Sequence, residues 1–426
     1  HEEEASISHE LRMRVGTKEK HYQRKIPSQS VIAGTLTILV FVGVYNPSST
    51  SVISICKRLP LQAAKARPSF VLHSQEKCDL FTGDWVPNNG APYYTNDTCW
   101  AIHNHQNCML YGRPDLEFTK WRWKPEACEL PIFDPLQFFS IVRNKRIAFV
   151  GDSVGRNQLQ SLICLLAKVE YPIQTVSRRA DQECRWEYRK HNFTIASFWA
   201  PFLVKFKERN STSDPGVFNL YLDEPDESWT TQIDDFNYVI INSARWFGRS
   251  TVCYENGTVS GCRYCRNNTG PELPPLYGYR KALRTAFKAL NSRTSYKALT
   301  FLRTIAPSHF ENGAWDKGGD CLRNAPWRRN EAELRGEEYE QYVVQMEELE
   351  TARMEGEVLG RRYGLMDVTR MMYLRPDGHP SKYGHWPNDK VAVYNDCVHW
   401  CLPGPIDALN DLFMEMLKRT ETVITS

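Results

Sequence analysis

RIAFVGDSV, residues 146–154, is the stretch of sequence that decides the fold. Its apolar run breaks at Gly-Asp-Ser and leads into Val154–Leu166, where leucine and isoleucine recur on one helix face. A strand that turns into a helix here places Ser153 at the helix N-terminus, where backbone N–H groups and the helix dipole can stabilise an oxyanion. The alternative is that Ser153 is only an N-cap residue, a position that serine often occupies.

A histidine near the other end of the sequence can activate that serine. His399 lies in NDCVHW, residues 395–400, three positions after Asp396. A serine hydroxyl is a poor nucleophile until a base takes its proton, and Asp-x-x-His supplies the base and the carboxylate that orients it. Each motif alone is a weak signal, but together they predict a serine acyl-transfer enzyme. We expect Ser153 Oγ within about 5 Å of a ring nitrogen of His399.

Other residues are candidates for binding the oxyanion or the substrate, and each has a plainer interpretation. Asn242 ends a predicted strand, where asparagine also makes turns, and Arg156 lies one helical turn after the serine but can be a surface arginine. His309 follows another predicted strand, and the Gly151 region offers backbone N–H groups. His379 is a rival base, although no carboxylate is as well placed for it.

The middle and C-terminal parts alternate between predicted strands and helices. Such alternation predicts an α/β fold with a central, mostly parallel sheet, in which ligands bind beyond the carboxyl ends of the strands. The predicted strands are Arg146–Val150, Phe236–Asn242, Ala298–Ile305 and Leu365–Thr369, and the predicted helices are Val154–Leu166, Tyr279–Leu290 and Glu337–Arg362.

The N-terminal part predicts a membrane attachment. Val31–Tyr45 has 15 residues without charge and follows a basic segment, which favours an uncleaved signal anchor of type II over a cleaved signal peptide or a buried core helix. The 426 residues carry 53 Lys and Arg against 50 Asp and Glu, so no strong field indicates a nucleic-acid partner. The predicted parts are a cytosolic tail (1–26), a transmembrane segment (27–46), a stem (47–76), a small Cys/Trp-rich subdomain (77–130) and a catalytic domain (131–426).

Cysteines and glycosylation acceptors both indicate an exported chain. Apart from Cys56, beside the predicted anchor, the 13 cysteines form an even set of 12, which is typical of a disulfide framework. Zinc is the rival for Cys262-Arg-Tyr-Cys265, but no second C-x-x-C accompanies it, so we predict no metal site. N-glycosylation acceptors stand at Asn96, Asn192, Asn210, Asn256 and Asn267.

Several long motifs together resemble the plant trichome-birefringence-like proteins. These motifs are GRPD (112–115), WRWKP (121–125), GDSVGRN (151–157) and NDCVHWCLPGPID (395–407), and the resemblance runs from Cys78 to about Phe413. It implies an SGNH/GDSL-esterase-like three-layer fold in a Golgi polysaccharide O-acetyltransferase, with Ser153, Asp396 and His399 as the triad and an acetyl-serine intermediate. RTIAPSHFENG (303–313) and GGDC (318–321) are most similar to the xyloglucan-acetylating branch, while xylan, mannan and pectin acetylating members share the core motifs.

The resemblance also implies disulfides, a donor and partners. It places the chain in the Golgi membrane with a lumenal catalytic domain, a cell-wall polysaccharide as acceptor, no bound cofactor, and acetyl-CoA or a lumenal acetyl carrier as donor, which a Golgi protein would supply. The usual third oxyanion glycine of such folds is not evident. The implied bridges are Cys78–Cys128, Cys99–Cys164, Cys108–Cys401 and Cys321–Cys397, with Cys262–Cys265 and Cys184–Cys253 remaining.

Two other functions compete with acetyl transfer. A polysaccharide acetylesterase would use the same triad and differ only in letting water, rather than a sugar hydroxyl, remove the acetyl group, which transfer prevents by excluding water. A non-enzymatic wall-polysaccharide-binding protein would depend on the Cys/Trp-rich segment instead, and it would tolerate the loss of Ser153.

Overall fold

The structure of this protein is a computed structural model that describes most of the sequence. The described residues are 78–178, 183–209, 216–265, 270–391 and 394–425. The tail, anchor and stem predicted for residues 1–76 lie outside them, as do the acceptors Asn210 and Asn267. In the described part, no helix is both long and apolar enough to span a bilayer.

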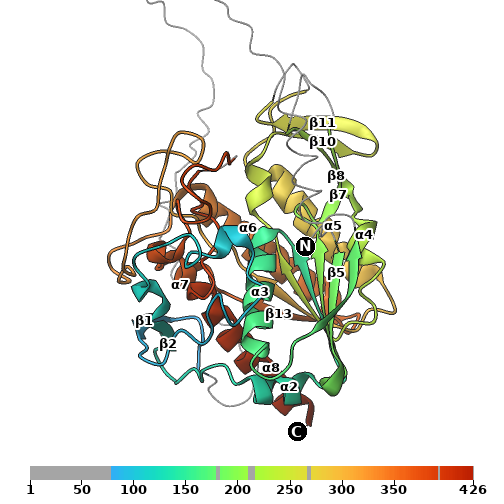
Figure 1. Ribbon diagram of the computed structural model, residues 1–426. Helices are drawn as coiled ribbons and strands as arrows, with labels where there is room; N and C mark the ends of the chain where they lie inside the picture. The colour runs from blue at the N-terminus through green and yellow to red at the C-terminus, as the bar shows by residue number, and fades with distance from the viewer. Residues whose placement is uncertain (1–77, 179–182, 210–215, 266–269, 392–393, 426) are drawn as a thin grey trace, which may run out of the picture. The chain divides into compact units, whose positions relative to one another are not determined.

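A seven-stranded sheet forms the centre of the fold (Figure 1). Its order is β13-β12-β9-β3-β6-β5-β4; the first five strands run parallel, and β5 and β4 form an antiparallel edge. The predicted mostly parallel sheet is therefore confirmed, with an edge that was not predicted. In sheet order the strands are Arg362–Met366, Leu299–Arg303, Tyr238–Asn242, Arg146–Gly151, Phe193–Trp199, Glu183–Tyr188 and Ile173–Arg178.

Helices cover both faces of this sheet, which gives three layers. Along β3, Ile147 and Phe149 join a core with α2, α3 and α8, whereas Ala148 and Val150 join a second core with α5 and α6. This alternation follows from the two-residue period of a strand, and the helices supply the apolar partners on each side. The helices are α2 (Pro135–Val142), α3 (Ser153–Leu166), α5 (Tyr277–Ser292), α6 (Gly336–Glu357) and α8 (Ala408–Thr425), with the short α4 (Glu227–Thr230) and α7 (Thr369–Tyr373).

A second sheet of four strands packs against the α5 side. The second sheet shares an apolar core with α5, and this core includes Leu220, Leu222 and Cys253. The predicted Cys184–Cys253 disulfide is wrong, because Cys184 lies on β5 of the central sheet and Cys253 on β10 of the second sheet; both are buried, and no disulfide joins them. The second sheet has the order β11-β10-β8-β7: Thr258–Arg263, Thr251–Glu255, Phe218–Pro225 and Val204–Glu208.

Residues 78–129, here called the N-terminal module, have no apolar core of their own. Their two-stranded sheet, β1 (Gly83–Pro87) with β2 (Trp121–Pro125), places Trp85 and Trp123 in the core that contains α3 and α8. The Trp85 indole N–H donates to Met371 O at 2.9 Å. A module of this size cannot bury enough surface alone, so it depends on the larger domain.

Among the described residues five disulfides form, and all five were predicted pairings. Two of them, Cys99–Cys164 and Cys108–Cys401, join the N-terminal module to the rest of the protein. Because Cys262 and Cys265 are bonded to each other, their thiolates are not available for the rival zinc site. The others are Cys78–Cys128 and Cys321–Cys397.

Candidate active site

Ser153 is the first residue of α3, at the turn that leaves β3. The preceding Asp152 caps the helix, because its Oδ1 accepts from Val154 N at 3.0 Å. Its Oδ2 accepts from the backbone N–H groups of Ala244 at 3.2 Å and Arg245 at 3.4 Å, just beyond β9. The Asp152 carboxylate thus links the end of β3 to the end of β9 and fixes the position of Ser153.

Asn242 approaches this turn so closely that two glycines are required. A Cβ on Gly151 (φ +151°) would lie 1.5 Å from Asn242 O, and one on Gly155 would lie 1.9 Å from Asn242 Oδ1. Asn242 is 2% exposed, and its Nδ2 donates to Asp152 Oδ1 at 3.0 Å. Gly151 and Asn242 therefore support the turn that carries Ser153.

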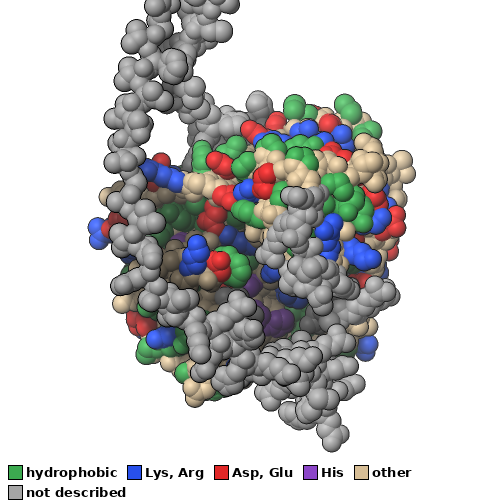
Figure 2. Space-filling model, turned by 90° about the horizontal axis from the view of Figure 1, so that it is seen from above, with side chains coloured by type: hydrophobic (Ala, Val, Ile, Leu, Met, Phe, Trp, Pro, Cys, Tyr) green, Lys and Arg blue, Asp and Glu red, His purple; other side chains and the backbone are tan. Residues whose placement is uncertain are grey.

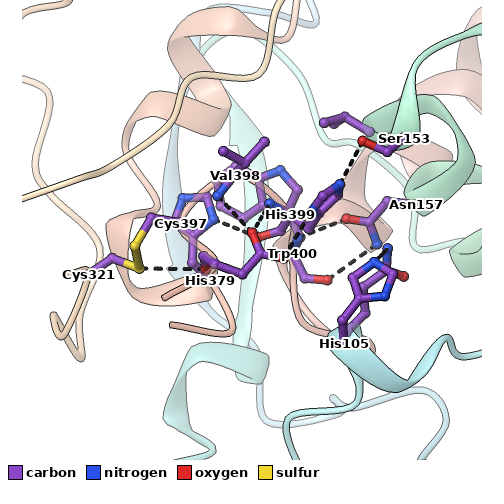
Figure 3. A network of polar contacts seen from close by, with 12 residues as sticks. His105, Ser153, Asn157, Cys321, His379, Cys397, Val398, His399 and Trp400 are labelled. Carbon is purple, nitrogen blue, oxygen red and sulfur yellow. Dashed lines mark hydrogen bonds and ion pairs between the residues drawn. A yellow bond between two sulfur atoms is a disulfide. The ribbon is translucent and has the colours of Figure 1, made fainter. Parts of the chain in front are cut away.

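His399 lies between Ser153 and Asp396 (Figure 3). Its Nε2 is 2.7 Å from Ser153 Oγ, well inside the predicted limit, and its Nδ1 is 2.8 Å from Asp396 Oδ2. Asp396 Oδ1 accepts from the backbone N–H groups of Val398 at 3.1 Å and His399 at 2.9 Å. The sequence placed these three groups together, and this spacing lets a proton leave the serine for Nε2 while the carboxylate holds the other nitrogen.

The charges of the pair support a base at Nε2. Burial by itself lowers the pKa of His399, but the charge and hydrogen bond of Asp396 outweigh it, so that pKa lies above 6.5. Burial alone would raise the pKa of Asp396, yet contact with His399 holds it well below 3.8. Asp396 is therefore ionised wherever His399 titrates, and it stabilises the imidazolium that forms when His399 takes a proton.

The loop that carries His399 is clamped to α3. Trp400 N donates to Asn157 Oδ1 at 2.8 Å, and Asn157 Nδ2 donates to Trp400 O at 3.2 Å. Asn157 lies four residues after Ser153, so the serine and the clamp share one face of the helix. The sequence analysis assigned no role to Asn157; its position one turn after the serine was the available signal.

Two buried histidines, His379 and His309, also hold the loop that carries His399. His379 Nδ1 is 2.6 Å from His399 O, and its Nε2 is 2.6 Å from His309 Nδ1. His309 Nε2 is 2.8 Å from Tyr373 O. The predicted contact of His309 with oxyanion or substrate is therefore wrong, because this side chain is 4% exposed and both ring nitrogens are engaged. His379, fully buried, is excluded as a rival base in the same way.

Arg156 reaches the site from α3 and His105 from the N-terminal module. The Arg156 guanidinium lies 5.0 Å from the Trp199 ring centroid, and its charge acts to lower the pKa of His399. His105 comes from the N-terminal module, and its ring centroid is 5.1 Å from that of His399. Figure 2 shows histidine side chains in a hollow of this face, with Lys and Arg side chains close by. The sequence predicted Arg156 near the serine but missed His105.

One group of side chains here has the composition of a metal site. Ligand atoms of His105, Asp396 and His399 lie within 4.8 Å of one another. Two of these three residues already bond to each other and to Ser153, so an ion bound there would remove the base from the serine. The arrangement is thus better suited to acyl transfer by the serine than to metal chemistry.

Comparisons with known proteins identify the family of this chain. The GDSL/SGNH-like acyl-esterase family found in Pmr5 and Cas1p matches residues 130–416, and the PMR5 N-terminal domain matches residues 76–129. The chain is 56% identical to trichome birefringence-like protein 19 of Arabidopsis thaliana, over 82% of this chain and 83% of that protein.

Relatives with a named activity are also found. Xyloglucan O-acetyltransferase 4 of Populus trichocarpa is 39% identical over 95% of this chain and 96% of its own length. Xyloglucan O-acetyltransferase 2 of Arabidopsis thaliana is 39% identical over 82% of this chain and 85% of its own length. The chain therefore belongs to the GDSL/SGNH-like acyl-esterase family found in Pmr5 and Cas1p, and within it to the trichome birefringence-like proteins.

Proposed function

We propose that this protein is an O-acetyltransferase that moves acetyl groups to hydroxyls of a cell-wall polysaccharide, xyloglucan, through an acetyl-serine. The observation that carries the proposal is the 2.7 Å contact between Ser153 Oγ and His399 Nε2, backed by Asp396. The relatives named xyloglucan O-acetyltransferases supply the acceptor.

In the first half-reaction Ser153 takes the acetyl group from the donor. Its Oγ forms a bond to the acetyl carbonyl carbon while its proton passes to His399 Nε2. The tetrahedral intermediate then expels the donor's leaving group, which receives that proton. Asp396 stays ionised throughout and stabilises the imidazolium. Backbone N–H groups at the start of α3, that of Ser153 first among them, are the proposed oxyanion donors.

The second half-reaction reverses these steps with a sugar. A hydroxyl of the polysaccharide gives its proton to His399 Nε2, and its oxygen attacks the acetyl-serine carbonyl. Collapse of this intermediate breaks the bond to Ser153 Oγ, which recovers the proton. We assign Arg156, which lies near His399 and over the Trp199 ring, to binding of the substrate. Gly151 and Asn242 support the turn that carries Ser153.

The cellular setting of this reaction is part of the proposal. Five disulfides favour an oxidising compartment, and Asn192 and Asn256 are exposed as glycosylation requires, with Asn96 partly exposed. We propose a type II Golgi membrane protein whose catalytic domain is lumenal, anchored by residues 27–46. Acetyl-CoA or a lumenal acetyl carrier is the proposed donor, delivered by a Golgi supply protein.

Product analysis tests the proposed activity. The full chain, incubated with an acetyl donor and a xyloglucan oligosaccharide, should add acetyl groups that mass spectrometry detects. Ser153→Ala should lower the rate by roughly 10⁴-fold or more while oligosaccharide binding persists. Loss of acetyl from a pre-acetylated oligosaccharide, with no gain on a bare one, would instead identify an acetylesterase. Addition to xylan, mannan or pectin fragments alone would move the acceptor to another branch.

A further inference from the structure

The N-terminal module places one imidazole directly beside the proposed catalytic base. The rings of His105 and His399 meet edge to face, with centroids 5.1 Å apart and an angle of 72° between their planes. His105 is an exposed residue, so it stands on the solvent side of the pair, and Figure 3 shows it and Ser153 arriving from different elements. Neither contact of the base uses it, since His399 bonds to Ser153 and Asp396.

The protein fixes this position by several independent contacts. Cys108, three residues after His105, is bonded to Cys401, two residues after His399. Leu402 N donates to Gln106 O at 2.9 Å. These contacts join the segment that carries His105 to the loop that carries His399, so the two rings are held together by covalent and hydrogen-bonded connections.

The ring has the chemistry that a sugar hydroxyl needs. Desolvation of the part of the ring that packs against His399, and then the positive charge of a protonated His399, lower the pKa of His105 to about 4, so it is neutral at pH 7 even though the residue is exposed on its other side. A neutral imidazole both donates and accepts one hydrogen bond, as a hydroxyl does. The Gln106 side chain contacts Nε2 at 3.2 Å, so a ligand would engage Nδ1.

An aromatic pair joins the segment that carries His105 to the loop before His399, because Tyr111 lies six residues after His105 and Trp386 lies thirteen residues before His399. The Tyr111 and Trp386 rings meet edge to face at 5.2 Å, and Trp386 is 51% exposed. Gly384, two residues before that tryptophan, lies against His105, where a Cβ would be 2.8 Å from the carbonyl oxygen. The segment that carries Trp386 therefore packs against the backbone of the segment that carries His105. Large exposed aromatic rings suit the apolar faces of sugar rings.

We propose that the N-terminal module builds the acceptor side of the active site. His105 binds a hydroxyl of the acceptor sugar next to the one that His399 deprotonates, and the Tyr111–Trp386 pair stacks on a neighbouring sugar residue. This inference rests on the proposed acetyl transfer to a polysaccharide. It gives these residues a role only in the second half-reaction, when the acceptor attacks the acetyl-serine.

The two half-reactions separate this role from general support of the triad. With the full chain, an activated acetyl ester reports formation of the acetyl-serine, and a xyloglucan oligosaccharide reports transfer. His105→Ala and His105→Gln should form the acetyl-serine at the wild-type rate, yet lower kcat/KM for the oligosaccharide by roughly 10- to 100-fold, as expected for one lost hydrogen bond in a site. Trp386→Ala should act mainly on the KM of long oligosaccharides.

His103→Gln is the matched control, because it changes the same residue type two positions away in the same segment. It should leave both half-reactions unchanged. Equal losses in acetyl-serine formation and in transfer for His105→Gln would overturn the inference, because His105 would then only position His399. Unchanged transfer in both His105 variants would also overturn it while leaving the proposed function standing. A wild type that acetylates no sugar would remove the proposed function itself.

Discussion

Each polar side chain around His399 constrains a different part of it. Asp396 fixes the ring, Asn157 clamps the next residue, and the His309–His379 pair holds the carbonyl oxygen. A base held by so many contacts is already oriented before substrate arrives, which removes the cost of ordering it in the transition state. Changes at these residues should therefore affect turnover more than substrate binding.

The raised pKa of His399 predicts the pH dependence of the first half-reaction. Only neutral His399 can accept the Ser153 proton, so the rate of acetyl-serine formation should rise as pH increases through that pKa, which lies above 6.5. Asp396→Asn removes the carboxylate that raises it, so the inflection should move to lower pH and the plateau should fall by roughly 10³–10⁴-fold. Rapid-mixing assays with an activated acetyl ester measure both. An unmoved inflection would show that another group titrates.

When both rings are neutral, the His309–His379 pair has one N–H group too few for its three contacts. Three contacts link Tyr373 O, two imidazoles and His399 O, and each needs an N–H, but two neutral rings hold only two. Burial lowers the pKa of His309 to about 4 and that of His379 well below 6.5, so the pair stays neutral at pH 7.

Removing the nearer histidine should loosen the base. His379→Ala takes away the partner of His399 O and leaves a cavity against Trp400, so stability should fall by about 2–4 kcal/mol and kcat should fall as well. Chemical denaturation and steady-state kinetics measure the two effects. The more distant His309→Ala should lower stability with a smaller loss of kcat; the reverse order would contradict this arrangement.

At the scale of elements, the sequence predicted β3 and β9, which end at the serine turn, and missed β6, the antiparallel edge and the second sheet. RIAFVG reads as a buried strand because apolar residues run without interruption, and β3, β9 and β12 lie where such runs occur. The second sheet was missed although FNLYLDEP, β8, alternates buried with less buried residues, which is the two-residue period of a strand. Its parallel pairing with β10, further along the sequence, has no local signal. Leu365–Thr369 was shifted, since β13 ends at Met366 and Thr369 begins α7.

Some residues of the candidate site could be predicted from local motifs, and others depend on contacts between distant parts of the sequence. Ser153 and the Asp-x-x-His pair follow from motifs, since each contains its own geometry. His105 could not be found like this, because its approach to His399 depends on a disulfide between residues 293 apart. Asn242 was correctly placed at the end of a strand and His309 after one. The direction of their side chains depends on Asp152 and His379, which local patterns do not reveal.

The disulfide beside the base provides a test at the element scale. Cys397 lies between Asp396 and His399, and its bridge to Cys321 closes a loop with a separation of 76 residues. Replacing both cysteines by serine should cost about 2–5 kcal/mol and lower kcat/KM. The same double replacement at Cys262 and Cys265, a bridge on β11 with a separation of three residues, should leave kcat/KM unchanged. Equal losses in the two variants would contradict a specific role for the first bridge.

For the whole molecule, two buried carboxyls join the N-terminal module, α3 and α8. Asp407 accepts from Tyr94 and from Ser161, both at 2.6 Å, and Asp411 accepts from Phe133 N at 2.9 Å. Burial raises the pKa of Asp407 to about 6 and that of Asp411 to about 7. These groups bind protons more tightly in the folded than in the unfolded protein, so their stabilising effect is complete below about pH 4, declines as pH rises above that value, and is lost once pH passes 6 to 7.

Asp411→Asn should remove part of this pH dependence. The amide keeps an acceptor for Phe133 N but has no charge to bury, so the thermal midpoint at pH 7.5 should rise, on the order of 2–4 °C, with a smaller rise at pH 5. Calorimetry of the wild type and the variant at both pH values measures the difference. A midpoint that falls equally at both values would show that the ionised carboxylate stabilises the fold.

The Cys108–Cys401 bridge also determines when the protein can become active during its synthesis. Cys78–Cys128 and Cys99–Cys164 can form once residue 164 has emerged, whereas Cys108 has to wait for a partner made 293 residues later. During that wait its thiol is open to wrong pairing with earlier cysteines, which an isomerase would have to undo. The imidazole of His105 can therefore be joined to the loop of the base only after nearly all of the α/β domain has been made.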